Sequence, residues 1–192
     1  MKQVFNGKVD FYLIGECLVL ARKQCGMLKN IGMDFGHYLD DQLIPRVNIA
    51  LCKYQEQLEQ TLAKDIEKDD YSREQIEAAE QHCGLRRGIT LSCAIFYKML
   101  VGMLNDAEPL LQGDMSDVLV TRIASIFENY ATKLVQISYN PDHSIAALIN
   151  IMGNVAFLAH EFLPLLKEQL EGRFKKTFVD LVHLQARLEG KS

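Results

Sequence analysis

Apolar residues recur along this chain with the alternating three- and four-residue spacing of amphipathic α-helices, and no stretch shows sustained two-residue alternation. A first helix is expected from Phe11 to Leu28, ending before Gly32 and Gly36, with Asp34 as the N-cap of the next. It carries two stripes: Phe11, Ile14, Leu18, Ala21, Cys25 and Leu28, and Leu13, Cys17, Leu20 and Met27. Two stripes imply two packing neighbours, so the pattern predicts that this helix lies inside a bundle.

A second helix is expected from about Tyr38 to Lys68, with Pro45 ending its first turn or kinking it. Its stripe is Ile44, Val47, Leu51, Tyr54, Leu58, Leu62 and Ile66. Segment 64–90 has few apolar residues and many charges. We interpret it as a mobile charged connection with one short helix over residues 73–82.

The chain after residue 90 predicts four more helices, separated by breaks at 113–114, 140–142 and 171–172. Ser116 is positioned to cap the second of these four. The stripes are Cys93, Phe96, Leu100, Met103, Ala107 and Leu110; Leu119, Ile123, Ile126, Tyr130, Leu134 and Ile137; Ile145, Leu148, Met152, Val155, Ala159, Phe162 and Leu166; and Phe174, Thr177, Leu181, Leu184 and Leu188.

About six main helices joined by short turns predict an all-α fold, an antiparallel stacked helical bundle. Residues 1–192 are expected to form a single all-helical region. Two interpretations of its boundaries remain open: a small stand-alone protein, or the C-terminal part of a longer chain.

The run from Ser144 to Leu166 is apolar and long enough to cross a bilayer. It also contains Asn150, Asn154, His160 and Glu161, and burying a carboxylate and an imidazole in lipid is costly. The sequence therefore favours a central helix buried on all sides, and no transmembrane segment.

The net charge and the cysteine pattern limit which partners and which cellular compartment are expected for this chain. The net charge is −4, so no overall positive field attracts phosphate backbones, and nucleic acid is not expected as a partner. The five cysteines form no CxxC pair, which suits a reducing cytoplasm. Cys17 and Cys25 are expected to pack in the core, and Cys83 is expected to be an exposed thiol.

The chain lacks the P-loop, GxGxxG, GxSxG and HExxH motifs. Asp34–His37 and Asp180–His183 have a three-residue spacing seen in metal-binding bundles, but surface or capping roles explain them better. We therefore predict no catalytic, cofactor-binding or metal-binding residues, and no enzyme.

Three polar features allow sharper alternatives. Asn150 and Asn154 either pair with neighbouring helices and fix their register, or form a polar notch for a partner. A small-molecule-binding or enzymatic bundle would use a pocket lined by His160, Asn154 and Cys93. A basic-aromatic cluster, Arg173, Phe174, Lys175 and Lys176, is a weak candidate for anionic lipid.

Several segments, in order, resemble the C-terminal helical region of exocyst component eighty-four, especially its plant form. They are residues 16–28, 43–51, 96–110, 126–135, 147–154 and 158–164. They are packing patterns rather than catalytic motifs, and they span about residues 10–170. The N-terminal coiled coil and the GTPase-binding pleckstrin-like domain of some family members are not seen in this sequence.

The resemblance implies a rod-like, non-catalytic subunit of the exocyst, which tethers secretory vesicles to the plasma membrane before fusion in exocytosis. Its implied partners are other exocyst subunits, with small GTPases as a further candidate. Its implied location is cytoplasmic, with peripheral recruitment to vesicles and plasma membrane. A generic helical adaptor unrelated to exocytosis remains an alternative, because fold does not fix function.

Overall fold

The computed structural model describes residues 11–84, 87–107, 115–175 and 177–188. Within these residues the secondary structure is helical and contains no strand, which confirms the all-α prediction. The elements are α1 (Phe11–Lys29), α2 (Gly36–Lys68), α3 (Arg73–Cys83), α4 (Leu91–Asp106), α5 (Met115–Ser138), α6 (Ile145–Phe157), a π-helical turn η2 (Leu158–Phe162), α7 (Leu163–Phe174) and α8 (Val179–Leu188). The predicted turn at 113–114 and Leu110 lie outside the described residues.

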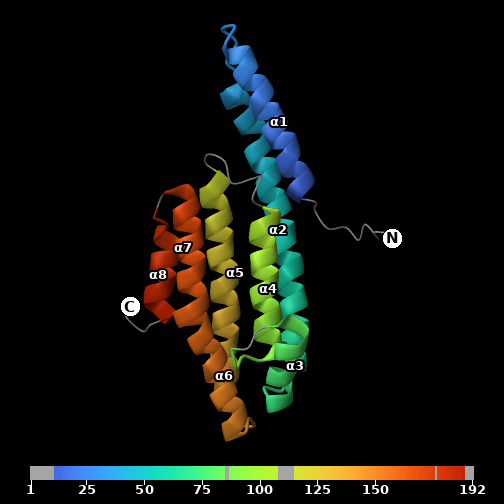
Figure 1. The fold of residues 1–192 in the computed structure, drawn as a ribbon, viewed down its shortest axis with the longest axis vertical. Coiled ribbons are helices and arrows are strands. Elements are labelled where there is room, and N and C mark those ends of the chain that lie inside the picture. The colour runs from blue at the N-terminus through green and yellow to red at the C-terminus, as the bar shows by residue number, and fades with distance from the viewer. Residues whose placement is uncertain (1–10, 85–86, 108–114, 176, 189–192) are drawn as a thin grey trace, which may run out of the picture.

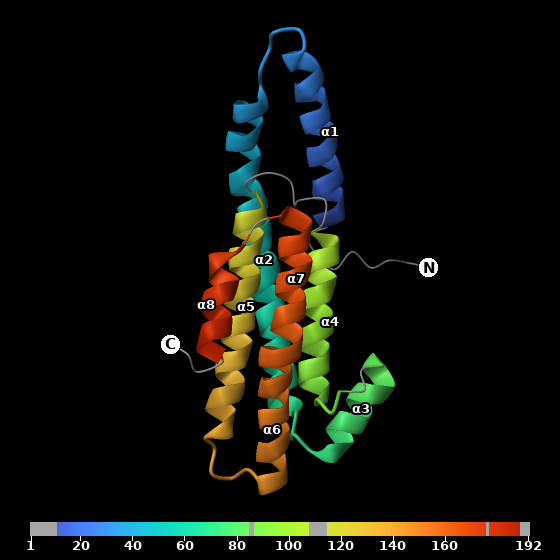
Figure 2. The same ribbon diagram turned by 60° about the vertical axis from the view of Figure 1, so that its left-hand side comes forward.

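The helices run side by side along one long axis (Figures 1 and 2). Helix α5 packs against α2, α6 and α8, and α2 also packs against α4. Elements α6, η2 and α7 form one continuous helix. Helix α1 and the first half of α2 form a hairpin that extends beyond the other helices in both views. We call this hairpin, residues 15–47, the arm.

An aromatic cluster occupies the core between α4, α5 and η2. The Phe96 and Tyr130 rings stack with centroids 4.1 Å apart, and Phe127 and Phe162 contact Phe96 edge-on. All four side chains are buried. Aromatic pairs of this geometry stabilise the core beyond the area that they bury, so this cluster joins α4, α5 and η2.

The predicted apolar stripes of α2, α4 and α5 are confirmed wherever they are described. Every described member of these three stripes is buried or partly buried against the core. Helix α2 runs through Pro45 from Gly36 to Lys68 without a break. These helices follow the simple rule that residues three and four apart share one face.

The prediction that α1 lies inside a bundle is wrong. Leu18, from the first stripe, is buried, but Cys17, Leu20 and Met27 from the second stripe are exposed. Helix α1 packs along the first half of α2, where it projects above the other helices (Figure 2). One apolar stripe therefore has a partner, and the other faces outward.

The long helix from α6 to α7 is not buried on all sides, and its predicted stripe is confirmed at Leu148 and Val155 but wrong at two other positions in the first half. Ile145 and Met152 are exposed, whereas Ala147, Ile151 and Asn154 are buried. The physical reason is η2, because a π-turn places one additional residue in the turn and shifts the inward face. Beyond η2 the predicted Leu166 is buried as expected.

The last interhelical break lies later than predicted. Helix α7 continues through Gly172 to Phe174, and the chain turns at Lys175 with a left-handed φ of 49°. Phe174 therefore belongs to α7, and Thr177 precedes α8. Leu181 and Leu184 are buried as the stripe of the last helix predicts.

The short helix predicted inside segment 64–90 is confirmed as α3. Its C-terminus is closed by Gly84 in the left-handed conformation, with φ 68°. Residues on both sides of α3, including Asp69 and Tyr71 before it and Ile89 after it, are buried. The mobility expected of this segment stays a prediction.

Replacing Phe96 with alanine should lower the free energy of unfolding by about 3–5 kcal/mol, because it opens a cavity among three other rings. Urea denaturation followed by circular dichroism measures this change. Tyr139→Ala is the matched control: Tyr139 is 80% exposed, and its change should stay within about 0.5 kcal/mol. Equal effects at the two positions would contradict the core assignment.

Candidate functional site

The principal buried polar site lies where the turn after α2, the start of α4 and the middle of α6 meet. We define this polar junction as Asp69, Thr90, Ser92 and Asn154, all buried. Buried polar groups are expensive unless they are hydrogen-bonded. These four side chains could therefore bind a ligand only if they do not already form hydrogen bonds with one another.

The Asp69 carboxylate is satisfied inside the protein. Its Oδ2 accepts hydrogen bonds from Thr90 Oγ1 at 2.6 Å and from the Ser92 amide at 3.1 Å. Its Oδ1 accepts from the Tyr71 amide at 2.9 Å. Because Ser92 lies in the first turn of α4, the carboxylate also acts at the positive end of that helix. Asp69 thus serves as a cap supplied from a distant turn.

Both asparagines of α6 are used in the same way. Asn154 Oδ1 accepts from the Thr90 amide at 3.0 Å, and Asn154 Nδ2 donates to Thr90 Oγ1 at 2.9 Å. Asn150 Nδ2 donates to the Tyr71 carbonyl at 2.7 Å. These bonds show that the two amides pair with neighbouring segments and fix the register of α6. Asn154 is fully buried, whereas Asn150 also borders an outer cleft between α3 and α6.

Tyr71, in the turn between α2 and α3, has a strained backbone conformation. Its φ is 58°, a left-handed value that costs about 1–2 kcal/mol for a residue with a Cβ. The Tyr71 amide donates to Asp69 and the Tyr71 carbonyl accepts from Asn150, and these two hydrogen bonds offset that cost. Its ring contacts His143 edge-on, and its hydroxyl has no hydrogen-bond partner among the described residues. Burial, with the nearby Asp69 charge, raises the pKa of Tyr71 well above its usual range, so the hydroxyl stays neutral.

The hypothetical pocket lined by His160, Asn154 and Cys93 does not form. Asn154 and Cys93 are fully buried, whereas His160 is exposed. Burial raises the pKa of the Cys93 thiol far above its ordinary value, and a protonated thiol is a poor nucleophile. These three residues cannot act on one substrate.

A cleft between α3 and α6 has a volume of about 510 Å³. Its polar lining is Arg73, Glu77, Glu80 and Asn150. Arg73 already pairs with Glu77 at 3.3 Å on the exposed face of α3, and the Asn150 amide is committed to Tyr71. The cleft therefore offers no nucleophile with an adjacent base, which is what covalent catalysis requires.

Metal ligands do not gather in the part of the chain that the structure describes, where no three His, Cys, Asp or Glu side chains could hold an ion together. Asp34 pairs with Lys29 at 2.9 Å and accepts from the Gly36 amide. The Lys29 hydrogen bond and charge, with that amide, lower the pKa of Asp34. Asp180 accepts from Thr121 Oγ1 at 2.7 Å. These carboxylates have structural partners.

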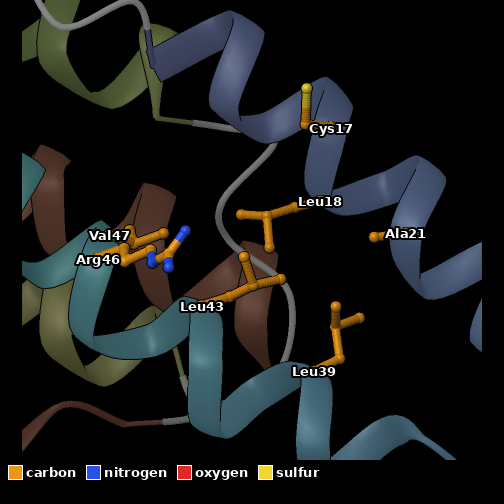
Figure 3. Close-up of a pocket in the computed structure, with 7 residues that line it drawn as sticks. All are labelled: Cys17, Leu18, Ala21, Leu39, Leu43, Arg46 and Val47. Carbon is orange, nitrogen blue, oxygen red and sulfur yellow. The ribbon is translucent and has the colours of Figure 1, made fainter.

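The arm contains an apolar groove of about 440 Å³ between α1 and α2. Its walls are Leu18, Ala21, Leu39, Leu43 and Val47, and its rim is Cys17 and Arg46 (Figure 3). The expectation that Cys17 packs in the core is wrong, and its exposure follows from the projecting position of α1. Cys25 and Cys83 are both partly exposed.

A second apolar surface lies on α6. Ile145, Ile149 and Met152 are exposed and spaced four and three residues apart, so they form one stripe. We call it the α6 face. By length and hydropathy, the helix Ile145–Phe174 could also span a membrane, and 39% of its most apolar window is buried within the bundle.

The basic-aromatic cluster is only partly described. Arg173 and Lys175 are exposed, and Phe174 packs partly against the core and contacts Phe178 edge-on. Lys176 lies outside the described residues. The described part supplies two exposed cations without an exposed aromatic side chain, and its contact with anionic lipid stays a prediction.

Comparison with known proteins relates this chain to a subunit of the exocyst. The chain is 25% identical over 203 aligned residues to Exocyst complex component 8 of Homo sapiens, and equally to those of Mus musculus and Bos taurus. Each alignment covers 94% of this chain and 28% of the relative, so the chain spans less than a third of their length. These matches support a relationship to an exocyst subunit.

No protein-family model matches the chain, and no solved structure matches it. The three relatives are mammalian, so they do not support the plant form in particular. The sequence predicts only part of the polar junction: it singles out Asn154, together with the neighbouring Asn150, but not Asp69, Thr90 or Ser92. In sequence, the Asp69-Asp70 pair indicates only a loop.

Asn154→Ala should lower the free energy of unfolding by about 2–3 kcal/mol, because it leaves the Thr90 amide buried without an acceptor. Tyr71→Phe is the matched control, since it removes a hydroxyl that has no partner among the described residues. Its stability should equal or exceed that of the wild type by about 0.5 kcal/mol. Thermal and urea unfolding measure both, and a loss at Tyr71→Phe equal to that at Asn154→Ala would contradict the assignment.

The cysteines should react unequally with an aromatic disulfide reagent in dilute native protein. Cys17 is exposed and should react quickly, whereas Cys93 is buried and protonated and should react only on unfolding. Cys17→Ser should remove a fast phase, and Cys93→Ser should leave the native time course unchanged. If native wild-type protein shows a rapid labelling phase that is absent from Cys93→Ser, Cys93 is accessible and the core is not closed.

Proposed function

We propose that this chain is a non-catalytic, exocyst-type tethering subunit that acts through protein–protein contacts along a helical bundle. The observation that carries the proposal is the alignment with Exocyst complex component 8 across 94% of the chain. Tethering of secretory vesicles to the plasma membrane is part of the proposal, and small GTPases stay a predicted further partner. The plant-type component eighty-four is the finer form of the same proposal.

The geometry supports a mechanical role. The polar groups of the described interior are satisfied by one another, apart from the Tyr71 hydroxyl. Most of the exposed large apolar residues instead lie on the arm and on the α6 face. Exposed apolar stripes rimmed by polar residues mark interaction surfaces.

The α6 face is the subunit contact that we infer. Its three residues, at i, i+4 and i+7, form the pattern that another amphipathic helix recognises. A helical subunit of the same complex is the proposed occupant, since the alignment with an exocyst component covers nearly the whole chain. Cytoplasmic location with peripheral recruitment to vesicles and plasma membrane follows from the same proposal.

The full chain, immobilised and incubated with eukaryotic cell extract, should capture exocyst subunits that mass spectrometry identifies. The triple variant Ile145→Asp, Ile149→Asp, Met152→Asp should reduce this capture at least about tenfold, because it places charges at an apolar contact.

The matched control puts the same three charges on exposed polar positions: Gln81→Asp, Gln169→Asp and Thr177→Asp. It should capture subunits as the wild type does, and circular dichroism checks that both variants are folded. Recovery of no exocyst subunit by the wild type would overturn the function. Equal capture by the two triple variants would overturn only the α6 assignment.

A further inference from the structure

The exposed side of α1 carries a largely apolar stripe next to the one that packs on α2, and its first residue, Cys17, borders the groove between the two helices. We define the α1 seam as Cys17, Leu20, Gln24 and Met27, all exposed, with Leu20 and Met27 each 58% exposed. The three, four, three spacing is that of the a and d positions in a heptad, through which one helix packs on another. In Figure 2, α1 stands at the edge of the arm with α2 on one side of it. The seam thus has the pattern of a helix contact whose second helix is not supplied by the described chain.

The charges beside the seam are one acid and one base. Glu16 and Lys23 directly precede Cys17 and Gln24, so they lie seven residues apart on the same flank. Both are exposed, and no ion pair joins either of them to another described residue. The neighbouring bases are already paired, Arg22 with Asp40 at 3.1 Å and Lys29 with Asp34 at 2.9 Å. Glu16 and Lys23 are therefore available to form ion pairs with a partner that packs on the seam.

An antiparallel copy of α1 satisfies both charges at once. When two identical helices lie antiparallel, the same flank of each meets, and a two-fold contact is reciprocal. An axis midway between positions 16 and 23 places Glu16 against Lys23 of the second copy, and Lys23 against Glu16 of the second copy. The same axis brings Cys17 close to Leu20 of the second copy, so the seam stays in register.

We propose that the α1 seam binds the α1 helix of a second copy of this chain, antiparallel and around a two-fold axis. The arm contains four acidic and four basic residues, so its two copies meet without net repulsion. This contact goes beyond the proposed function, because it needs no other subunit.

The charge pattern favours this occupant over two others. A parallel copy would set Glu16 and Lys23 against the opposite flank, where the facing positions are Ala21 and Leu28 and carry no charge. An anionic lipid surface needs an excess of basic residues, which an arm of zero net charge does not offer.

The first test is the concentration dependence of the full chain's mass, measured by sedimentation equilibrium. The wild type should pass from monomer to dimer as concentration rises, and Cys17 should react more slowly with the disulfide reagent in the dimer. Leu20→Asp, Met27→Asp should raise the dissociation constant at least about tenfold, because the charges replace apolar contacts. The matched control Ile149→Asp, Met152→Asp changes residues of the α6 face that are 65% and 57% exposed, and it should dimerise normally.

The second test exchanges the charges and identifies the antiparallel geometry. Glu16→Lys alone or Lys23→Glu alone should weaken self-association about fivefold, because each sets like charges against one another at two places. An equimolar mixture of these two variants should form a heterodimer, since every facing pair is again opposite in charge. The double variant Glu16→Lys, Lys23→Glu should restore self-association.

Three outcomes would overturn the inference. One is a wild type that stays monomeric at every concentration reached, and another is self-association that both single charge variants leave unchanged. The third combines a monomeric wild type that captures exocyst subunits with a variant Leu20→Asp, Met27→Asp that does not capture them. That result would make the seam a contact with a different protein.

These outcomes are separable from the proposed function. Failure to capture exocyst subunits with normal dimerisation would overturn the tethering assignment and leave the α1 contact standing. Normal capture of exocyst subunits by a chain that stays monomeric would overturn the α1 contact and leave the tethering assignment standing.

Discussion

The arrangement of the bundle depends on one buried carboxylate. Asp69 accepts hydrogen bonds from Tyr71, Thr90 and Ser92, and Thr90 is in turn bonded to Asn154 on α6. An unpaired carboxylate in this place would be strongly destabilising. The donors to Asp69 come from the turn after α2 and from the start of α4, and Asn154 joins α6 to the same Thr90. The junction therefore specifies which segments meet, while apolar packing supplies most of the stability.

The apolar pattern of the sequence predicts which residues are buried wherever a helix has one continuous inward face. Helices α2, α4 and α5 obey a regular stripe, and their burial follows it. The prediction for α1 was wrong because a second stripe shows only that a partner is needed, not that this chain supplies it. The sequence does not single out Asp69, Thr90 and Ser92 of the polar junction, because they are ordinary turn and helix-start residues, and only tertiary contacts bring them together.

The two ends of the molecule differ in how their helices are supported. The lower helices close around the aromatic cluster of Phe96 and Tyr130, whereas the arm has two helices and one shared groove. Helix α2 belongs to both parts, because Val47 lines the groove and Leu58 and Leu62 lie in the core. A load applied at the turn between α1 and α2 would thus be transmitted to the core along a single unbroken helix.

The π-turn η2 also sets the rotational phase between the two halves of the longest continuous helix. Leu158, Phe162, Leu166 and Leu170 are all buried at four-residue intervals, a spacing that would drift around an uninterrupted α-helix by about 40° per step. The widened turn takes up part of that drift. Deleting one residue there should restore ordinary α-helical winding and leave α7 close to its present orientation relative to α6, because the widened turn already absorbs one additional residue. The additional residue in η2 therefore lets positions four apart, from Leu158 to Leu170, stay on the buried side of this helix.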